Sequence, residues 1–137
     1  MSAVAITDVI IVDIENHHPN FICLNFANAD MVGHTGVFEA CVKAVETVDT
    51  CIGRLLACGI QHDYEILIIA DHGNSDYMIN EDGTPNTAHT MNPVPCVYIG
   101  KSGTKLSFGN LADIAPTILG LFGIELPLEM NGTNLLY

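Results

Sequence analysis

Basic residues are scarce in this chain, which has 4 lysines and arginines against 16 aspartates and glutamates and a formal net charge of −12. Nucleic acids and anionic membrane surfaces attract proteins through lysine and arginine. The composition therefore predicts neither a nucleic-acid partner nor a membrane partner. An anionic small substrate would require metal ions, or basic residues from elsewhere, to reverse the local field.

Long hydrophobic runs are also missing, since no apolar stretch reaches the roughly 18 residues that a membrane helix needs. The N-terminus lacks a basic region followed by a long apolar core, so no targeting segment is indicated. Yet 49% of the 137 residues are hydrophobic, enough for a sizeable core, and the mean hydropathy of +0.35 is high for a soluble domain this small. This predicts one domain, or part of one, with buried strands or with a face covered by chain that is not present here.

Paired cysteine spacings are absent, and the 5 cysteines are odd in number and scattered. Three of them fall within a predicted helix, where cysteine commonly acts as a small hydrophobic residue. The pattern predicts a reduced, cytoplasmic protein with neither a disulfide framework nor a zinc knuckle.

The most informative stretch is residues 66–74, in which an aliphatic run ends abruptly in Asp71, His72 and a glycine. The run is typical of a strand buried on both faces. Polar groups at the tip of such a strand are costly unless something binds them, and a divalent metal would bind both. The alternative is an aspartate that caps a turn beside a surface histidine.

Hydrophobic spacing predicts the remaining elements. Strands are expected at 21–26, 66–69 and 96–99, helices at 3–16, 37–58 (stopped by Gly59) and 113–121, with a loop at 28–34 and an extended tail over 124–137. Strand, helix and strand in succession indicate a right-handed βαβ unit. The predicted fold class is therefore α/β with three layers and a mainly parallel sheet.

Polar residues gather where the predicted parallel strands end, and ligands bind at that edge of such sheets. They are two carboxylates and three imidazoles: Asp30, His34, Asp71, His72 and His89. This mixture of oxygen and nitrogen donors suits Mn²⁺ or Zn²⁺ better than Mg²⁺ or Ca²⁺. The five residues are the candidate metal ligands.

Three segments resemble one known family closely, namely residues 25–36, 70–74 and 85–95. Their runs Asn-Phe-Ala-Asn, Met-Val-Gly-His-Thr-Gly and Thr-Ala-His-Thr-x-Asn-Pro-Val-Pro are similar to signatures of cofactor-independent (2,3-bisphosphoglycerate-independent) phosphoglycerate mutase. That family belongs to the alkaline phosphatase superfamily, whose members share the Asp-x3-His and Asp-His elements more widely. The resemblance extends from about residue 6 to the C-terminus.

The resemblance implies a two-manganese site and an alkaline-phosphatase-like fold. Asp30, His34 and His89 would hold one Mn²⁺, and Asp71 and His72 would contribute to the second; Zn²⁺ or Mg²⁺ are the alternative ions. The family interconverts 3-phosphoglycerate and 2-phosphoglycerate in glycolysis through a phosphoserine. Two cations close together can lower the serine's pKa and neutralise charge on the transferring phosphoryl group.

The family chain is several times longer than this one, and its N-terminal portion supplies the nucleophilic serine, an aspartate ligand and a substrate domain. Residues 1–137 are therefore expected to be the C-terminal segment of the metal-binding domain, with the missing N-terminal segment as partner. The serines present (2, 75, 102 and 107) lie outside the family's nucleophile context. No catalytic residue is assigned in this chain, its substrate-binding residues are unknown, and it is expected to be inactive alone.

Two other functions remain open. The chain could belong to another metal-dependent phosphatase or phosphomutase, against which the mutase-specific flanks argue, or be a non-catalytic metal-binding module. Some polar residues have two interpretations. Asn28, Asn74 and Thr87 could orient the metal ligands, but turn formation explains them equally well. Ala29 and Asp76 stand where the family usually carries proline and glutamate.

Overall fold

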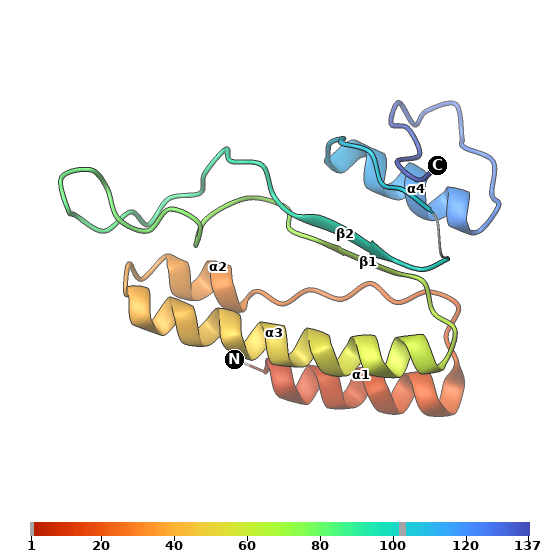
Figure 1. Cartoon of the computed structure of the whole chain (residues 1–137), viewed down its shortest axis with the longest axis horizontal. Helices are drawn as coiled ribbons and strands as arrows, with labels where there is room; N and C mark the ends of the chain where they lie inside the picture. Colours follow the sequence, from red (N-terminus) through yellow and green to blue (C-terminus); the bar gives the residue numbers. More distant parts are fainter. Residues whose placement is uncertain (1, 102–103) are drawn as a thin grey trace.

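The helices and strands lie in three layers in the computed structural model, which describes residues 2–101 and 104–137. Figure 1 shows a two-stranded sheet with the long helices on one side and the last helix on the other. In chain order the elements are α1 (Ala3–His17), α2 (Asn28–Gly33), α3 (Phe38–Gln61), β1 (Ile66–Ile69), β2 (Cys96–Ile99), the 3-10 turn η1 (Leu111–Asp113) and α4 (Ile114–Leu121). The predicted helices over 3–16, 37–58 and 113–121 and the strands over 66–69 and 96–99 are thus confirmed.

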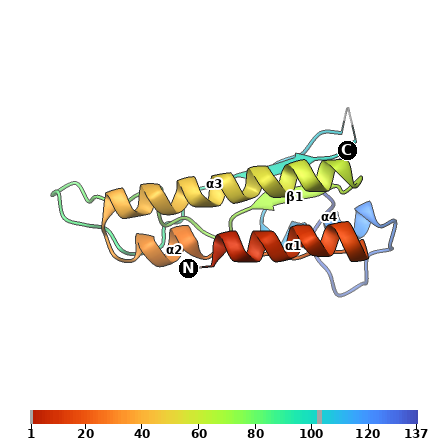
Figure 2. The same cartoon turned by 90° about the horizontal axis from the view of Figure 1, so that it is seen from below.

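Small side chains allow α1 and α3 to pack along each other, and α2 lies in line with α1 against the other half of α3 (Figure 2). The buried residues of the pair are Ala3, Thr7 and Ile14 on α1 and Cys41, Ala44, Cys51, Cys58 and Gly59 on α3. All 5 cysteines are free thiols. Within the described part of the chain, no helix has the length and apolar character needed to cross a membrane.

Helix α3 continues past the glycine that was expected to stop it. It runs to Gln61, and Gly59 is a buried residue within its last turn. A Cβ atom at Gly59 would lie 2.9 Å from Cδ1 of Ile66, the first residue of β1. The glycine therefore serves the close approach of strand and helix rather than the helix end, and the expected stop is wrong.

The strand directions differ from the prediction. β2 pairs antiparallel with β1, with Ile66 opposite Ile99 and Ile69 opposite Cys96. Residues 21–26 are extended, with side chains alternately more and less exposed, but they belong to no ladder among the described residues. The expected parallel strand pair is therefore not observed. An antiparallel partner needs no crossover helix, and the chain between β1 and β2 simply leaves the sheet and returns (Figure 1).

Asp113, at the start of α4, ties this helix to the tail. Its carboxylate accepts hydrogen bonds from the backbone N–H groups of Asn110 and Thr133, both at 2.8 Å. Residues 124–137 otherwise lack helices and strands, apart from one isolated bridge between Leu106 and Leu136. The hydrogen bonds from the backbone of Thr133 and Asn110 lower the pKa of the buried Asp113 carboxyl below its usual value of 3.8.

We predict that Asp113→Asn lowers the melting temperature of the chain by several degrees at pH 7. A depressed native pKa stabilises the fold fully above the unfolded value near 3.8 and loses that contribution as the pH falls through the native value. The difference between the two proteins should therefore shrink below pH 4, which thermal unfolding followed by circular dichroism from pH 7 to pH 2.5 would measure. A difference that stays constant with pH would contradict the assigned role.

Candidate metal centre

Asp30 and His34 meet across the end of α2, a six-residue helix where a loop was expected. Helical geometry places residues four apart on the same face, one turn above the other. The Asp30 Oδ1 and His34 Nε2 atoms are accordingly 3.2 Å apart. The prediction of a loop is wrong because a helix of six residues is too short to show a hydrophobic period.

The imidazole of His34 is held in one orientation by a backbone carbonyl. Its Nδ1 lies 2.7 Å from the carbonyl oxygen of Thr87, 53 residues further along the chain. Because that oxygen only accepts, Nδ1 carries the proton and donates it, which leaves the lone pair of Nε2 facing Asp30. This is the arrangement in which a metal-binding histidine is usually found.

His89 brings a third donor atom to the same point from the long loop between β1 and β2. Its Nε2 lies 3.2 Å from Asp30 Oδ1 and 3.1 Å from His34 Nε2. One ligand atom from each of the three residues lies within 4.8 Å of the other two. The structure thus brings together Asp30, His34 and His89, as the sequence predicts.

The spacing of these three atoms fits a bound divalent cation. Nitrogen and oxygen ligands lie about 2.0–2.2 Å from a transition-metal ion, so neighbouring ligands at tetrahedral or octahedral angles are about 2.8–3.6 Å apart. The separations of 3.1–3.2 Å fall within this range. Lone pairs of two imidazoles and a carboxylate at this distance repel one another unless a proton or a cation lies between them.

Asn74 forms a hydrogen bond with the Asp30 carboxylate of this cluster. The side chain is buried, and its Nδ2 donates to Asp30 Oδ1 at 3.0 Å and lies 3.5 Å from His34 Nε2. Its Oδ1 is buried and has no hydrogen-bond partner among the described residues. Any side chain at Gly33 would collide with this oxygen, so the glycine allows the amide to reach Asp30. The contacts of Asn74, like that of Thr87, favour ligand orientation over turn formation.

Asp71 and His72 lie beside the cluster rather than within it. The His72 ring stacks on that of His89, with centroids 3.7 Å apart and planes inclined by 21°. The Asp71 side chain is 81% exposed, and its Oδ2 lies 3.8 Å from His72 Nε2. The described residues offer no third ligand to this pair, so its role in a second metal site stays a prediction.

Comparisons with known proteins decide the family. Residues 1–126 match the model of the family described as the metalloenzyme superfamily. The chain belongs to this superfamily. Its relatives include a 2,3-bisphosphoglycerate-independent phosphoglycerate mutase of Bacteroides thetaiotaomicron, 53% identical over 137 residues, which are 99% of this chain and 27% of the relative. A Methanosarcina barkeri protein, 2,3-bisphosphoglycerate-independent phosphoglycerate mutase 2, is 55% identical over 138 residues, 99% of this chain and 26% of that one.

A solved structure resembles this metalloenzyme chain throughout its length. A crystal structure of Leishmania mexicana phosphoglycerate mutase at low cobalt concentration matches with a TM-score of 0.88 and 31% identity, over 100% of this chain and 28% of that one. The predicted resemblance to the mutase family and the alkaline-phosphatase-like, partial α/β fold class are thereby confirmed. The chain spans about 27% of the length of the curated relatives that it matches.

The serines that the structure describes in this metalloenzyme chain contact the fold around them rather than the candidate metal ligands. The Ser75 hydroxyl donates to the carbonyl oxygen of Ala29 at 3.0 Å and lies 3.0 Å from Cys41 Sγ, between α2 and α3. Ser107 donates to the carbonyl of Leu135. Ser2 precedes α1, and Ser102 lies outside the described residues. None of the described hydroxyls reaches the cluster of Asp30, His34 and His89 through a hydrogen bond.

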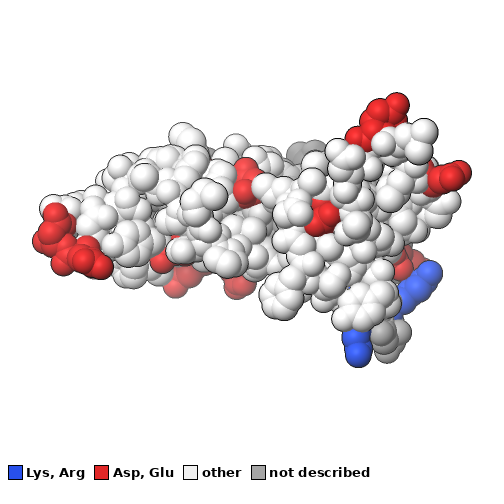
Figure 3. Space-filling view, turned by 90° about the horizontal axis from the view of Figure 1, so that it is seen from above, with Lys and Arg blue, Asp and Glu red and all other residues white. Residues whose placement is uncertain are grey.

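The surface charge is consistent with a need for cations. On the face shown in Figure 3, acidic side chains appear at several places, whereas basic ones appear only at one corner. With a net charge of −12, the chain as a whole repels anions. Bound divalent ions would change the sign of the local field at the metal centre.

Proposed function

We propose that this chain supplies the metal-holding part of the active site of a 2,3-bisphosphoglycerate-independent phosphoglycerate mutase. The convergence of Asp30, His34 and His89 in a chain whose relatives carry that name supports this proposal. In this view residues 1–137 form the C-terminal segment of the metal-binding domain of a cytoplasmic, glycolytic enzyme. The reaction interconverts 3-phosphoglycerate and 2-phosphoglycerate.

The proposed first site takes Mn²⁺ on Asp30, His34 and His89, with Zn²⁺ or Mg²⁺ as alternatives. The chain's own residues prepare this site: Thr87 fixes the tautomer of His34, and Asn74 holds the Asp30 carboxylate. When bound, divalent ions would neutralise negative charge on the phosphoryl group that is transferred. The orientation of the ligands before binding lowers the reorganisation that binding requires.

The proposed second site includes Asp71 and His72, and an aspartate and a serine from the rest of the enzyme complete it. The serine oxygen bonds to phosphorus while the phosphorus–oxygen bond to the glycerate breaks, and the proton lost by the serine goes to the glycerate oxygen that leaves. The reverse transfer then places the phosphoryl group on the other hydroxyl of the reoriented glycerate and frees the serine. This chain lacks that serine, so it is inactive alone.

The rest of the same enzyme is the proposed partner of this chain. The chain covers 27% of its relative's length, and it exposes many large apolar side chains on both layers of helices. Phe21 and Phe122, for example, form an edge-to-face pair although each is about half exposed. Large exposed apolar surfaces are typical of protein that is covered in its functional state.

Manganese binding tests the proposed first site directly. Free Mn²⁺ gives a strong electron paramagnetic resonance signal in solution, which weakens when protein binds the ion. We expect the chain to bind one Mn²⁺ tightly, because only the first site has three ligands in place, and Asp30→Ala to remove that binding. A signal that the unsubstituted chain does not weaken would contradict the proposal.

A further inference from the structure

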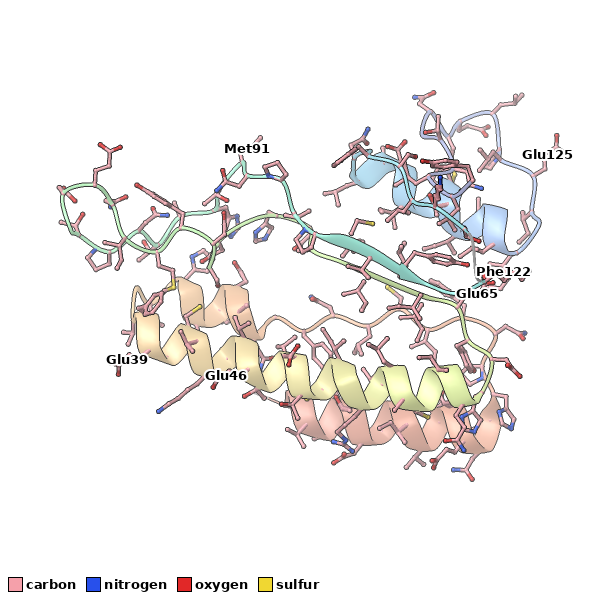
Figure 4. All side chains as sticks on the ribbon, in the orientation of Figure 1. Glu39, Glu46, Glu65, Met91, Phe122 and Glu125 are labelled. Atoms are coloured by element: carbon pink, nitrogen blue, oxygen red, sulfur yellow. The ribbon has the colours of Figure 1, made fainter. Side chains whose placement is uncertain are left out.

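The loop that carries His89 is attached by hydrogen bonds rather than by burial. No side chain from residue 79 to residue 95, all of which the structure describes, is buried. Met91, close to His89, is fully exposed and lies on the side of the loop away from α2 and α3 (Figure 4). Apolar packing therefore contributes little to the position of His89. Asp30 and His34, in contrast, belong to α2 and its C-cap.

Asp76 makes most of the side-chain hydrogen bonds that attach this part of the loop. Its Oδ2 accepts from Asn92 Nδ2 at 2.6 Å, and its two carboxylate oxygens lie 2.9 and 3.1 Å from the Thr90 hydroxyl that donates to them. The Thr90 N–H donates to the carbonyl of Gly73 at 2.8 Å. These contacts join the segment after His89 to the segment after His72.

The carboxylate form of Asp76 suits this role. The hydrogen bond from Asn92, helped by that from Thr90, lowers the pKa of Asp76, although desolvation opposes the shift. Hydrogen bonds to an ionised acceptor are shorter and roughly twice as strong as neutral ones. The two segments are also tightly packed, because a Cβ atom at Gly73 would collide with the hydroxyl of Thr90.

We propose that Asp76 is a positioning residue that, by holding Thr90 and Asn92, fixes the His89 ring against His72 and beside the other two ligands. His89 is the residue directly before Thr90, so its backbone follows wherever that residue is anchored. The effect on metal affinity rests on the proposed function of the site, whereas the effect on the ring's position does not. Loss of groups that orient metal ligands typically weakens metal binding about 10–100-fold.

The experiment compares three variants with the unsubstituted chain. Asp76→Ala removes the acceptor, and Asp76→Glu restores a carboxylate. Asp82→Ala is the matched control, since Asp82 accepts from the hydroxyl and N–H of Thr84 in the same loop without contacting the His89 segment. The first readout is the nuclear Overhauser contact between the His72 and His89 rings in metal-free protein. The second is the Mn²⁺ dissociation constant.

We expect Asp76→Ala to lose the contact between the rings and to raise the dissociation constant at least about 10-fold. Asp76→Glu should recover most of the affinity, and Asp82→Ala should change neither readout. If Asp76→Ala does not fold, the double variant Thr90→Val, Asn92→Ala removes the same hydrogen bonds from the other side.

Two results would overturn the positioning role: a ring contact that persists without the Asp76 carboxylate, or a ring contact that is absent from the unsubstituted chain. If the contact depends on Asp76 but the unsubstituted chain binds no Mn²⁺, the positioning role holds and the proposed metal function fails.

Discussion

Alanine in place of His34 or His89 should remove most of the thermal stabilisation that Mn²⁺ gives to this chain. A ligand at a hundred times its dissociation constant stabilises a native protein by about 2.7 kcal/mol. For a chain of this length that corresponds to a rise in melting temperature of roughly 10 °C. Each substitution removes one of three ligand atoms that lie within 4.8 Å of one another, so little of the rise should remain.

The matched control is His17→Ala. His17 forms the same local arrangement as His34, with an aspartate four residues earlier and 2.8 Å between its Nδ1 and Asp13 Oδ1, but no third ligand joins this exposed pair. The quantity to compare is the shift that Mn²⁺ causes in each protein, measured by calorimetry, because the substitutions can also change the metal-free stability. An equal shift in all four proteins would contradict the assignment of the site.

The elements that the sequence predicts well are those with a local signal. Helix α3 shows apolar residues at steps of three and four over many turns, and β1 and β2 are short runs of apolar residues. Helix α2 has no such signal because it is a single short segment. The direction of β2 depends on how the chain packs after the long loop. The residues of Cys96–Ile99 themselves do not indicate it.

The metal ligands can be predicted from the sequence, whereas the residues that orient them cannot. Asp30, His34 and His89 are found from the sequence because residue type and flanking motif identify them together. Asp76 carries no such mark, and its role becomes visible only through contacts with residues 14 and 16 positions later. Asn74 reaches Asp30 across 44 residues. Interactions of this kind follow from the tertiary structure, which brings the two loops together.

Joined to the rest of a mutase, this segment should support an activity that it lacks alone. The design replaces the matching 27% of the Bacteroides thetaiotaomicron relative, which is 53% identical, with these 137 residues. With 3-phosphoglycerate and Mn²⁺, phosphorus NMR should show conversion to 2-phosphoglycerate by the hybrid and none by the isolated chain. In the hybrid, Asp30→Ala should reduce kcat about a thousand-fold, since a catalytic metal contributes several kcal/mol and each 1.36 kcal/mol is a factor of about ten.

Ser75→Ala is the control within the hybrid, because the Ser75 hydroxyl contacts the Ala29 carbonyl and Cys41 rather than the metal cluster. It should leave kcat within about threefold of the unsubstituted hybrid. Turnover by the isolated chain above a Mn²⁺-only blank, removed by Ser75→Ala, would show that the nucleophile is present here after all. A folded hybrid that binds Mn²⁺ but converts no substrate would instead separate metal binding from the proposed reaction and favour the non-catalytic alternative.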